Sequence, residues 1–225
     1  MALRPAYVQY PPRGHRRVVQ PAIEPVTETE LRTHVKADIL MLPDSEAKRL
    51  IAQAREFIEE MYGIAIINQT WRLSLDAWPG YETPWWDGVR EMAITELQSG
   101  RPKVLHLPRY PLSSIASVKV YDEASLETVL NVASIFDVDT ESRPGRLALK
   151  FGQLWPLATR PTNAVVIEYV AGFGALVTDV PAGVRAAVLL QAGYFYDHSG
   201  ECDMRTAFAK SGAADIMAAY SLRGL

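Results

Sequence analysis

The stretch AREFIEEMYGIAIINQTWRLSLDAWP, residues 54–79, changes its hydrophobic period halfway along. Before Gly63 the apolar residues recur at the spacing of one face of an α-helix. After Gly63, the residues Trp71, Leu73 and Leu75 alternate with polar residues, as in a β-strand that is buried on one face. The stretch therefore predicts an amphipathic helix that ends near Gly63, followed by a half-buried strand.

Two helices are expected upstream of this strand. Thr27 and Glu30 have the spacing of a capping box, in which each side chain accepts a hydrogen bond from the other residue's backbone N–H. Asp44 is expected to cap the second helix. The apolar face of that helix needs a partner, and it consists of Ala47, Leu50, Ile51, Ala54, Ile58 and Met61.

More strands are expected downstream, after a long connection at 79–103 whose middle could form a short helix. They are predicted at 104–107, 117–121, 134–138, 146–150 and 164–169. Short, turn-rich connections favour antiparallel pairing, because a parallel crossover needs about a dozen residues or more. The helical period then returns: Pro181 suits the first turn of a helix that ends near 198–200. A last helix is expected at 204–220, weakened at Gly212.

The predicted fold class is therefore α+β. N-terminal helices at 27–63 and C-terminal helices at 175–225 are expected to pack together as a helical bundle, with an antiparallel β module at 64–174 inserted between them.

Residues 1–26 differ from the rest, because they contain five prolines and no acidic residue before Glu24. Proline lacks the N–H that helices and sheets use, so this segment is expected to be an extended basic arm. It is either a disordered terminus or an arm that becomes ordered on a neighbouring subunit.

Trp85 and Trp86 are either a local cap over the sheet or a contact surface. The residues expected to contact another subunit or the tail side are Arg13, Arg16, Arg17, Trp85 and Trp86.

Composition excludes several classes of protein. The formal net charge of -3 argues against wholesale coating of nucleic acid or anionic membrane, although a local basic patch is compatible with it. Cys202 is the single cysteine, so the chain has no internal disulfide and no CxxC pair. No apolar run approaches the roughly 18 residues of a membrane span, and the start lacks the apolar core of a signal peptide. We expect a soluble protein made in the cytoplasm.

Catalytic motifs are absent from the sequence: there is no HExxH, GxSxG or Walker A loop. The run Gly172–Gly174 lacks the third glycine of a dinucleotide loop. The carboxylates of Glu59 and Glu60, and those of Asp137 and Asp139, are explained by solvated faces of a helix and a strand.

The densest polar cluster could hold a divalent metal, or support a thiol nucleophile with His198 as its base. It consists of Asp197, His198, Glu201, Cys202 and Asp203. Polar residues are expected at such a helix end in any case. We therefore assign no catalytic residue, no cofactor and no metal ligand, and expect the protein not to be an enzyme.

The ordered series of motifs resembles the head–tail connector (adaptor) family of tailed phages and gene transfer agents. The resemblance begins with residues 54–79 quoted above, which pair a helix ending in Tyr-Gly with a strand reading Gln-Thr-Trp. It continues through LPRYPLSSIASVKVYD, PGRLALKFGQLWP, NAVVIEYVAGFG and VPAGVRAAVLLQAGYFYDH, at 107–122, 144–156, 163–174 and 180–198. The long connection at 79–103 and the basic arm depart from the family pattern.

This resemblance implies a virion structural protein of the particle neck. Family members form a ring of about twelve copies beneath the portal protein, and the ring continues the DNA channel towards a stopper or tail-completion protein. DNA would pass through without sequence-specific binding. The family's C-terminal segment tends to reach the portal, which here implies portal contacts by Tyr220, Leu222, Arg223 and Leu225; a frayed end is the alternative. The competing hypotheses are a stopper protein of the same particle and, more distantly, a metal- or thiol-dependent enzyme.

Overall fold

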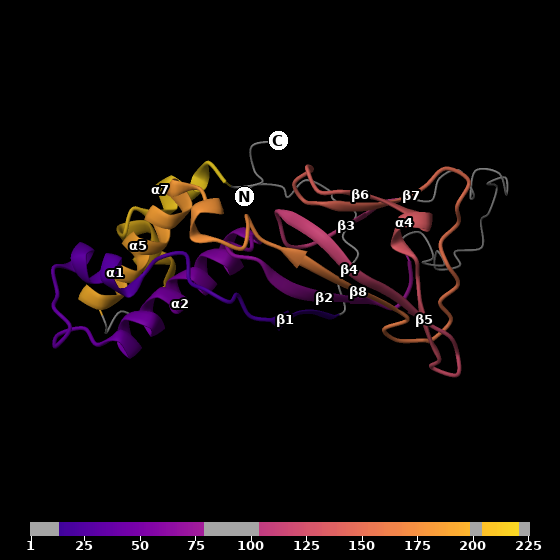
Figure 1. Ribbon diagram of the computed structural model, residues 1–225, viewed down its shortest axis with the longest axis horizontal. Coiled ribbons are helices and arrows are strands. Elements are labelled where there is room, and N and C mark those ends of the chain that lie inside the picture. The colour runs from indigo at the N-terminus through magenta and orange to yellow at the C-terminus, as the bar shows by residue number, and fades with distance from the viewer. Residues whose placement is uncertain (1–13, 79–103, 199–203, 221–225) are drawn as a thin grey trace, which may run out of the picture.

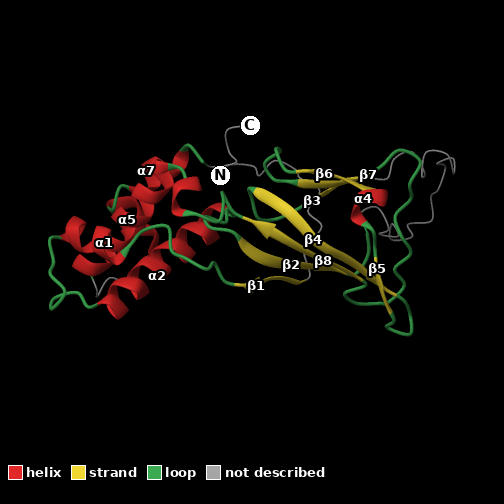
Figure 2. Ribbon diagram, viewed as in Figure 1, coloured by secondary structure: helices red, strands yellow, loops and turns green. Residues whose placement is uncertain are grey.

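Helices and sheets occupy opposite ends of an elongated molecule in the computed structural model (Figure 1). The structure describes residues 14–78, 104–198 and 204–220. Figure 2 shows most helices grouped at one end and the strands filling the rest of the length, with the short helix α4 (Val132–Ile135) among the strands. The predicted α+β class is confirmed. In the described ranges, no helix combines the length and the apolar character needed to span a bilayer.

The helical end is built from both ends of the chain. Helices α1 (Glu28–Val35) and α2 (Asp44–Tyr62) pack against α5 (Ala182–Asp197), which also contacts α6 (Met204–Lys210) and α7 (Ala213–Ala218). The predicted packing of N- and C-terminal helices is therefore confirmed. Their shared core includes Leu31, Leu50, Ile51, Ile58, Val184, Val188, Phe208 and Met217.

The helix ends agree with the sequence at most positions. The capping box is present: Glu30 N donates to Thr27 Oγ1 at 3.2 Å, and Thr27 N donates to Glu30 Oε2 at 2.8 Å. Gly63 ends α2 in the left-handed conformation, with φ of 69°. The expected cap at Asp44 is wrong, because Pro43 is the N-cap residue and makes no side-chain cap bond. The Asp44 carboxylate instead accepts from Arg32 at 2.8 Å.

A five-stranded antiparallel sheet forms the middle of the molecule. Its strands, in spatial order, are β1 (Gly14–Val19), β2 (Gln69–Leu75), β8 (Val165–Ala171), β4 (Leu112–Tyr121) and β5 (Glu127–Val129). In β2, Trp71, Leu73 and Leu75 are buried while the residues between them are only half-buried. That alternation is the one predicted from the sequence.

A three-stranded antiparallel sheet covers one face of the larger one. It consists of β3 (Val104–His106), β7 (Arg146–Leu149) and β6 (Phe136–Asp139). The inner faces share one hydrophobic core, in which Trp78 and Trp155 stack with ring centroids 4.6 Å apart beside Phe136. The strand expected to start at residue 134 begins later, because the short helix α4 (Val132–Ile135) precedes β6.

Two strands of the larger sheet lie where the sequence predicted none. β5 is a three-residue strand whose residues are all exposed, so it has no alternating pattern to detect. β1 lies inside the segment expected to be an extended arm, and it pairs with β2 of its own chain. Residues 14–19 thus form an edge of the sheet.

Candidate functional site

The face of the five-stranded sheet that points away from the core is polar. Successive residues of a strand point to opposite faces, so the residues that alternate with the core residues along each strand form cross-strand rows on this outer face. One row over β1, β2 and β8 consists of Arg16, Arg72 and Glu168. The next row consists of Gly14, Ser74, Val166 and Lys119. Because Gly14 and Ser74 are small, the second row forms a low floor between longer polar side chains.

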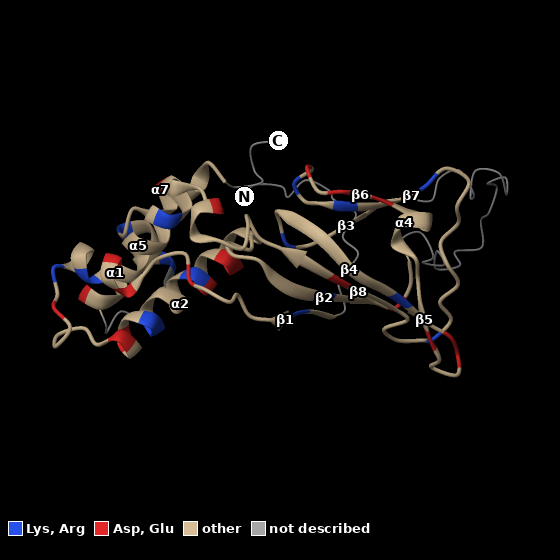
Figure 3. Ribbon diagram, in the orientation of Figure 1, with Lys and Arg blue, Asp and Glu red and all other residues tan. Residues whose placement is uncertain are grey.

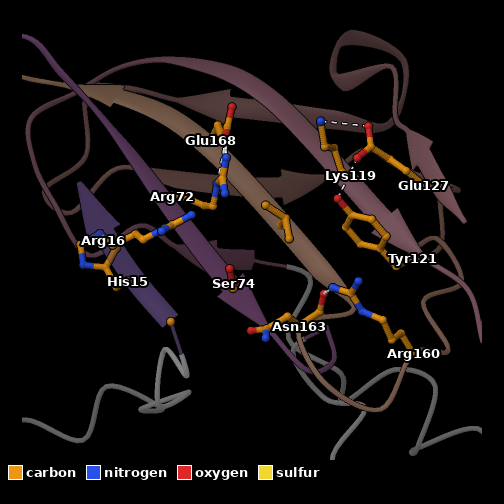
Figure 4. A pocket seen from close by; sticks show the side chains of 12 residues that line it. His15, Arg16, Arg72, Ser74, Lys119, Tyr121, Glu127, Arg160, Asn163 and Glu168 are labelled. Carbon is orange, nitrogen blue, oxygen red and sulfur yellow. Dashed lines mark hydrogen bonds and ion pairs between the residues drawn. The ribbon is translucent and has the colours of Figure 1, made fainter. Parts of the chain in front are cut away.

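A pocket of about 820 Å³ lies over this floor (Figure 4). Its charged lining residues are Arg16, Arg72, Lys119, Arg160, Glu127 and Glu168. Its neutral polar lining residues are His15, Ser74, Tyr121 and Asn163. Four basic residues thus face two acidic ones, whereas the whole chain has 23 basic and 26 acidic residues. The pocket is therefore a local basic patch on a chain whose net charge is negative. Figure 3 shows where the basic and acidic residues lie on the helices and strands.

Both acidic residues of the pocket are paired with a basic one. Arg72 Nε donates to Glu168 Oε1 at 2.8 Å, and Lys119 Nζ lies 2.9 Å from Glu127 Oε1. Tyr121 also donates to Glu127 at 2.7 Å. The hydrogen bonds from Lys119 and Tyr121 lower the pKa of Glu127. Glu127 therefore stays ionised, and it neutralises Lys119.

Arg160 is held in place by groups that do not neutralise its charge. Its guanidinium lies over the ring of Tyr121, 4.0 Å from the centroid. Its Nε donates to the carbonyl of Thr162 at 2.8 Å, and a terminal nitrogen donates to the carbonyl of Asn163. A guanidinium has five N–H donors, so these two bonds leave three for another acceptor. No ion pair joins Arg160 to a carboxylate within the described residues.

Arg16 is exposed on β1 and lies directly opposite Arg72 in the register of the two strands. Within the described part of the chain it has no acidic partner, since Glu168 is bound by Arg72. Like charges directly opposite one another destabilise an antiparallel pair. Arg16 and Arg160 are therefore the two uncompensated cations of the pocket, as far as the described ranges extend.

Beneath the pocket, His15 anchors β1 to the sheet. Its Nε2 lies 2.8 Å from the hydroxyl of Tyr169, and its ring stacks on Trp71 with centroids 4.8 Å apart. The Tyr169 oxygen also accepts the backbone N–H of Arg109. Burial, and then the charge of Arg109, lower the pKa of His15 to about 4. His15 is therefore neutral near pH 7.

Arg17, on the same side of β1 as His15, connects the sheet to the helical end. It pairs with the exposed Glu56 and with Glu59, and it donates to Gln69 at 3.0 Å. Glu59 is buried, so the expectation that it lies on a solvated helix face is wrong. Glu59 also accepts from Arg55 at 2.9 Å and from the backbone N–H of Ile66 at 2.8 Å. Burial raises the pKa of Glu59, while Arg55 and the hydrogen bonds oppose that effect. This cluster fixes β2 and α2 relative to each other.

Large apolar side chains are exposed at both ends of the molecule. The connection between α1 and α2 reaches the tip of the helical end and carries Ile39, Leu40 and Met41 (Figure 1). The backbone N–H groups of Leu40 and Met41 donate to Asp38 Oδ1, both at 2.9 Å, which fixes this loop. At the opposite end, the segment after β7 carries Phe151, Leu154 and Leu157. Exposed apolar groups of this size are typical of contact surfaces.

The structure describes only some of the residues predicted to form sites. Arg16 lines the pocket, and Arg17 is bound within its own chain. Tyr220 is half-buried against its own fold, because its carbonyl accepts from Tyr110 at 2.8 Å and its ring meets Phe173 edge-on. The predicted contact residues that lie outside the described ranges are Arg13, Trp85, Trp86, Leu222, Arg223 and Leu225.

The polar cluster at 197–203 also lies mostly outside the described residues. Of its members, Asp197 and His198 are described, and the His198 ring stacks on Tyr194 with centroids 4.1 Å apart. Within the described ranges, no three His, Cys, Asp or Glu side chains come together as a group that could hold a metal ion. The remaining members are Glu201, Cys202 and Asp203.

Comparison with known proteins gives a match at the level of structure. No protein-family model and no curated protein matches the chain. A chain from the "Neck of empty GTA particle computed with C6 symmetry" superposes with a TM-score of 0.67 at 20% identity, covering 88% of this chain and 94% of that one.

Two further solved structures agree with this match. A chain from the "Virion of native gene transfer agent (GTA) particle" gives a TM-score of 0.67 at 21% identity, covering 94% of this chain and 97% of that one. A chain from the "Neck of native GTA particle computed with C12 symmetry" gives 0.61 at 20%, covering 88% and 94%. The chain therefore has the fold of proteins found in the neck of gene transfer agent particles.

Proposed function

We propose that this chain is a structural protein of the neck of a phage-like or gene transfer agent particle. Within the neck it acts as the head–tail adaptor: it forms a ring beneath the portal, extends the DNA channel and offers the attachment surface for the stopper or tail. The observation that carries the proposal is the shared fold over most of the length of both chains, with a TM-score of 0.67.

The symmetry named for the similar particles supports a closed ring of identical copies. Those necks were computed with C6 and C12 symmetry. In such a ring each copy contacts its neighbours through two different surfaces. This chain offers distinct surfaces: two apolar tips, one at each end, and a basic face on the sheet between them.

The exposed apolar tips support contact with other subunits. Leu40 is 88% exposed and Phe151 is fully exposed, at 103%. Burying such a side chain contributes about 1.5–3 kcal/mol. A subunit of an assembly gains this free energy when neighbouring subunits cover the two tips.

The family resemblance implies a portal contact, and the structure reduces the set of candidate residues for it to the last ones of the chain. Tyr220 already contacts Tyr110 and Phe173 of its own fold. We therefore assign portal binding to Leu222, Arg223 and Leu225 and give Tyr220 the role of attaching this segment to the body. Arg16 remains a candidate for contact with a neighbour, whereas the contacts of Arg17 lie inside the chain.

The decisive experiment is a cryo-EM map of the neck of the particle that carries this chain. A ring directly beneath the portal is expected. A position further along the tail axis would instead favour the stopper alternative, and absence from the particle would overturn the proposal.

A second experiment tests the portal contact. Deleting residues 221–225 leaves the Tyr220 contacts in place, so the variant is expected to fold and to lose binding to the portal. Its thermal unfolding is measured alongside as the control for folding. Unchanged portal binding by the folded variant would contradict the assignment.

A further inference from the structure

The basic pocket on the outer sheet face has the features of a binding site for an anion. Arg16 and Arg160 bring two charges that no carboxylate of the described residues neutralises. Arg16 lies opposite Arg72, whose charge is already paired with Glu168, so the Arg16 charge is the one in this row that has no partner within the described residues. An anion bound in the pocket would supply the partner that Arg16 and Arg160 lack among the described residues.

The spacing of the two cations indicates an extended ligand with several charges. Arg16 lies on β1, and Arg160 stacks on Tyr121 of β4, with β2 and β8 between them. Neighbouring strands are about 4.8 Å apart, so β1 is separated by about 14 Å from β4, the strand of Tyr121 on which Arg160 stacks. One carboxylate or one free phosphate is too small to satisfy both. A regularly charged polymer fits this distance, which is close to the roughly 12 Å width of a DNA major groove.

The side chains between the cations are the types that contact a DNA backbone. Ser74 and Asn163 line the pocket between Arg16 and Arg160, and Figure 4 shows them on its floor and rim. Hydroxyl and amide groups, with arginine, commonly bind phosphate oxygens and carry no sequence information.

We propose that this pocket contacts the phosphate backbone of double-stranded DNA, with Arg16 and Arg160 on separate phosphates. The inference rests on the proposed function, in which DNA passes through the ring. Each copy contributes about two phosphate contacts, and the nearby carboxylates of Glu127 and Glu168 repel DNA. The contact is therefore weak, independent of sequence and easily broken by salt. Such a contact guides DNA and still allows it to pass.

The test uses the full chain and a fluorescently labelled DNA duplex, with binding followed by anisotropy at increasing KCl concentration. For about two phosphates, the slope of log K against log salt should be about -1.8. Arg16→Ala should weaken binding several-fold and reduce the magnitude of the slope by about 1. Because Arg16 has no acidic partner in the described part of the chain, this variant keeps the fold. Arg160→Ala should act in the same direction.

Lys36→Ala is the matched control, because Lys36 is an exposed cation at the helical end, remote from the pocket. Its DNA binding should equal that of the unaltered chain. The proposal is overturned if the unaltered chain does not bind DNA at low salt, or if Arg16→Ala and Lys36→Ala have equal effects.

A second arm replaces DNA by a polyglutamate peptide. If Arg16→Ala weakens peptide binding and leaves DNA binding unchanged, the pocket takes an acidic protein segment and the DNA assignment is wrong. The cryo-EM position of the ring is independent of either result. A failure of this inference is therefore distinguishable from a failure of the proposed function.

Discussion

His15 and Tyr169 are joined by a hydrogen bond of 2.8 Å although 154 positions separate them in the chain. The bond connects the edge strand β1 to β8, the central strand of the sheet, and lies beneath the Arg16 pocket. The imidazole is neutral near pH 7, because burial and then the charge of Arg109 lower the pKa of His15 to about 4. Attachment of β1 therefore depends on the protonation state of one side chain.

The first prediction is that the free energy of unfolding falls in acid, because the attachment of β1 through His15 is weakened. The pKa of His15 is about 4 in the folded chain, against an ordinary value of 6.5, so the unfolded state binds the proton more tightly. The His15 contribution is complete above pH 6.5 and is lost as the pH falls towards 4. After allowance for partial exposure, it is about 2 kcal/mol.

Urea unfolding measured across this pH window checks the prediction. His15→Phe keeps an aromatic ring against Trp71 but does not titrate, so its unfolding free energy should depend less on pH than that of the unaltered chain. Parallel pH curves for the two proteins would show that His15 is not the group responsible.

The second prediction concerns Glu59, which is buried and accepts from Arg55, Arg17, Gln69 and the backbone of Ile66. Glu59→Gln should lower the free energy of unfolding by about 1–3 kcal/mol, because a neutral amide cannot accept all the buried hydrogen bonds of the carboxylate, while Glu24 and Glu56 still pair with Arg55 and Arg17. Glu56→Gln is the control: Glu56 also binds Arg17 but is exposed, so its loss should cost less than about 1 kcal/mol. Urea unfolding of the two variants measures both losses, and equal losses would contradict the role given to Glu59.

The third prediction concerns Gly172, whose φ is 152°. A side chain there would overlap the backbone N and Cα of Asn68. Gly172→Ala should therefore destabilise the chain by about 2–5 kcal/mol, from backbone strain and overpacking together. Gly152→Ala is the comparison, because φ is 79° there and the space for a Cβ is open. It should cost about 1 kcal/mol. Denaturant midpoints of the two variants measure the difference, and a milder effect at Gly172 would refute it.

The sequence predicts elements whose burial follows a local period. Trp71, Leu73 and Leu75 alternate, and the apolar face of α2 recurs every turn, so each was predictable without knowing its neighbours. β1 was not predictable in this way, because its inward residues His15 and Arg17 are polar. They are accommodated by Tyr169 and Glu59, which are far away in the sequence.

The pocket, like β1, could not be predicted from local sequence patterns alone. Arg16 was identified from the sequence as a contact residue because it belongs to a basic segment. Ser74 and Arg160 gave no signal, since a strand position facing solvent and a cation in a connecting segment are ordinary features. They become a site only when β1 pairs with β2 and Arg160 stacks on Tyr121.

The last prediction concerns the apolar tip beyond β7, where Phe151 and Leu154 are exposed. Replacing both by serine removes no contact of the core, so the free energy of unfolding should change by less than about 0.5 kcal/mol per site. Under the proposed function a neighbour covers this tip, and losing two buried side chains would cost assembly about 3–6 kcal/mol. We therefore expect fewer copies of the double variant in purified particles, counted by quantitative mass spectrometry. Gln153→Ser, in the same exposed segment, should leave incorporation unchanged. Normal incorporation of the double variant would mean that this tip is free in the particle, and the contact would then have to lie elsewhere on the chain.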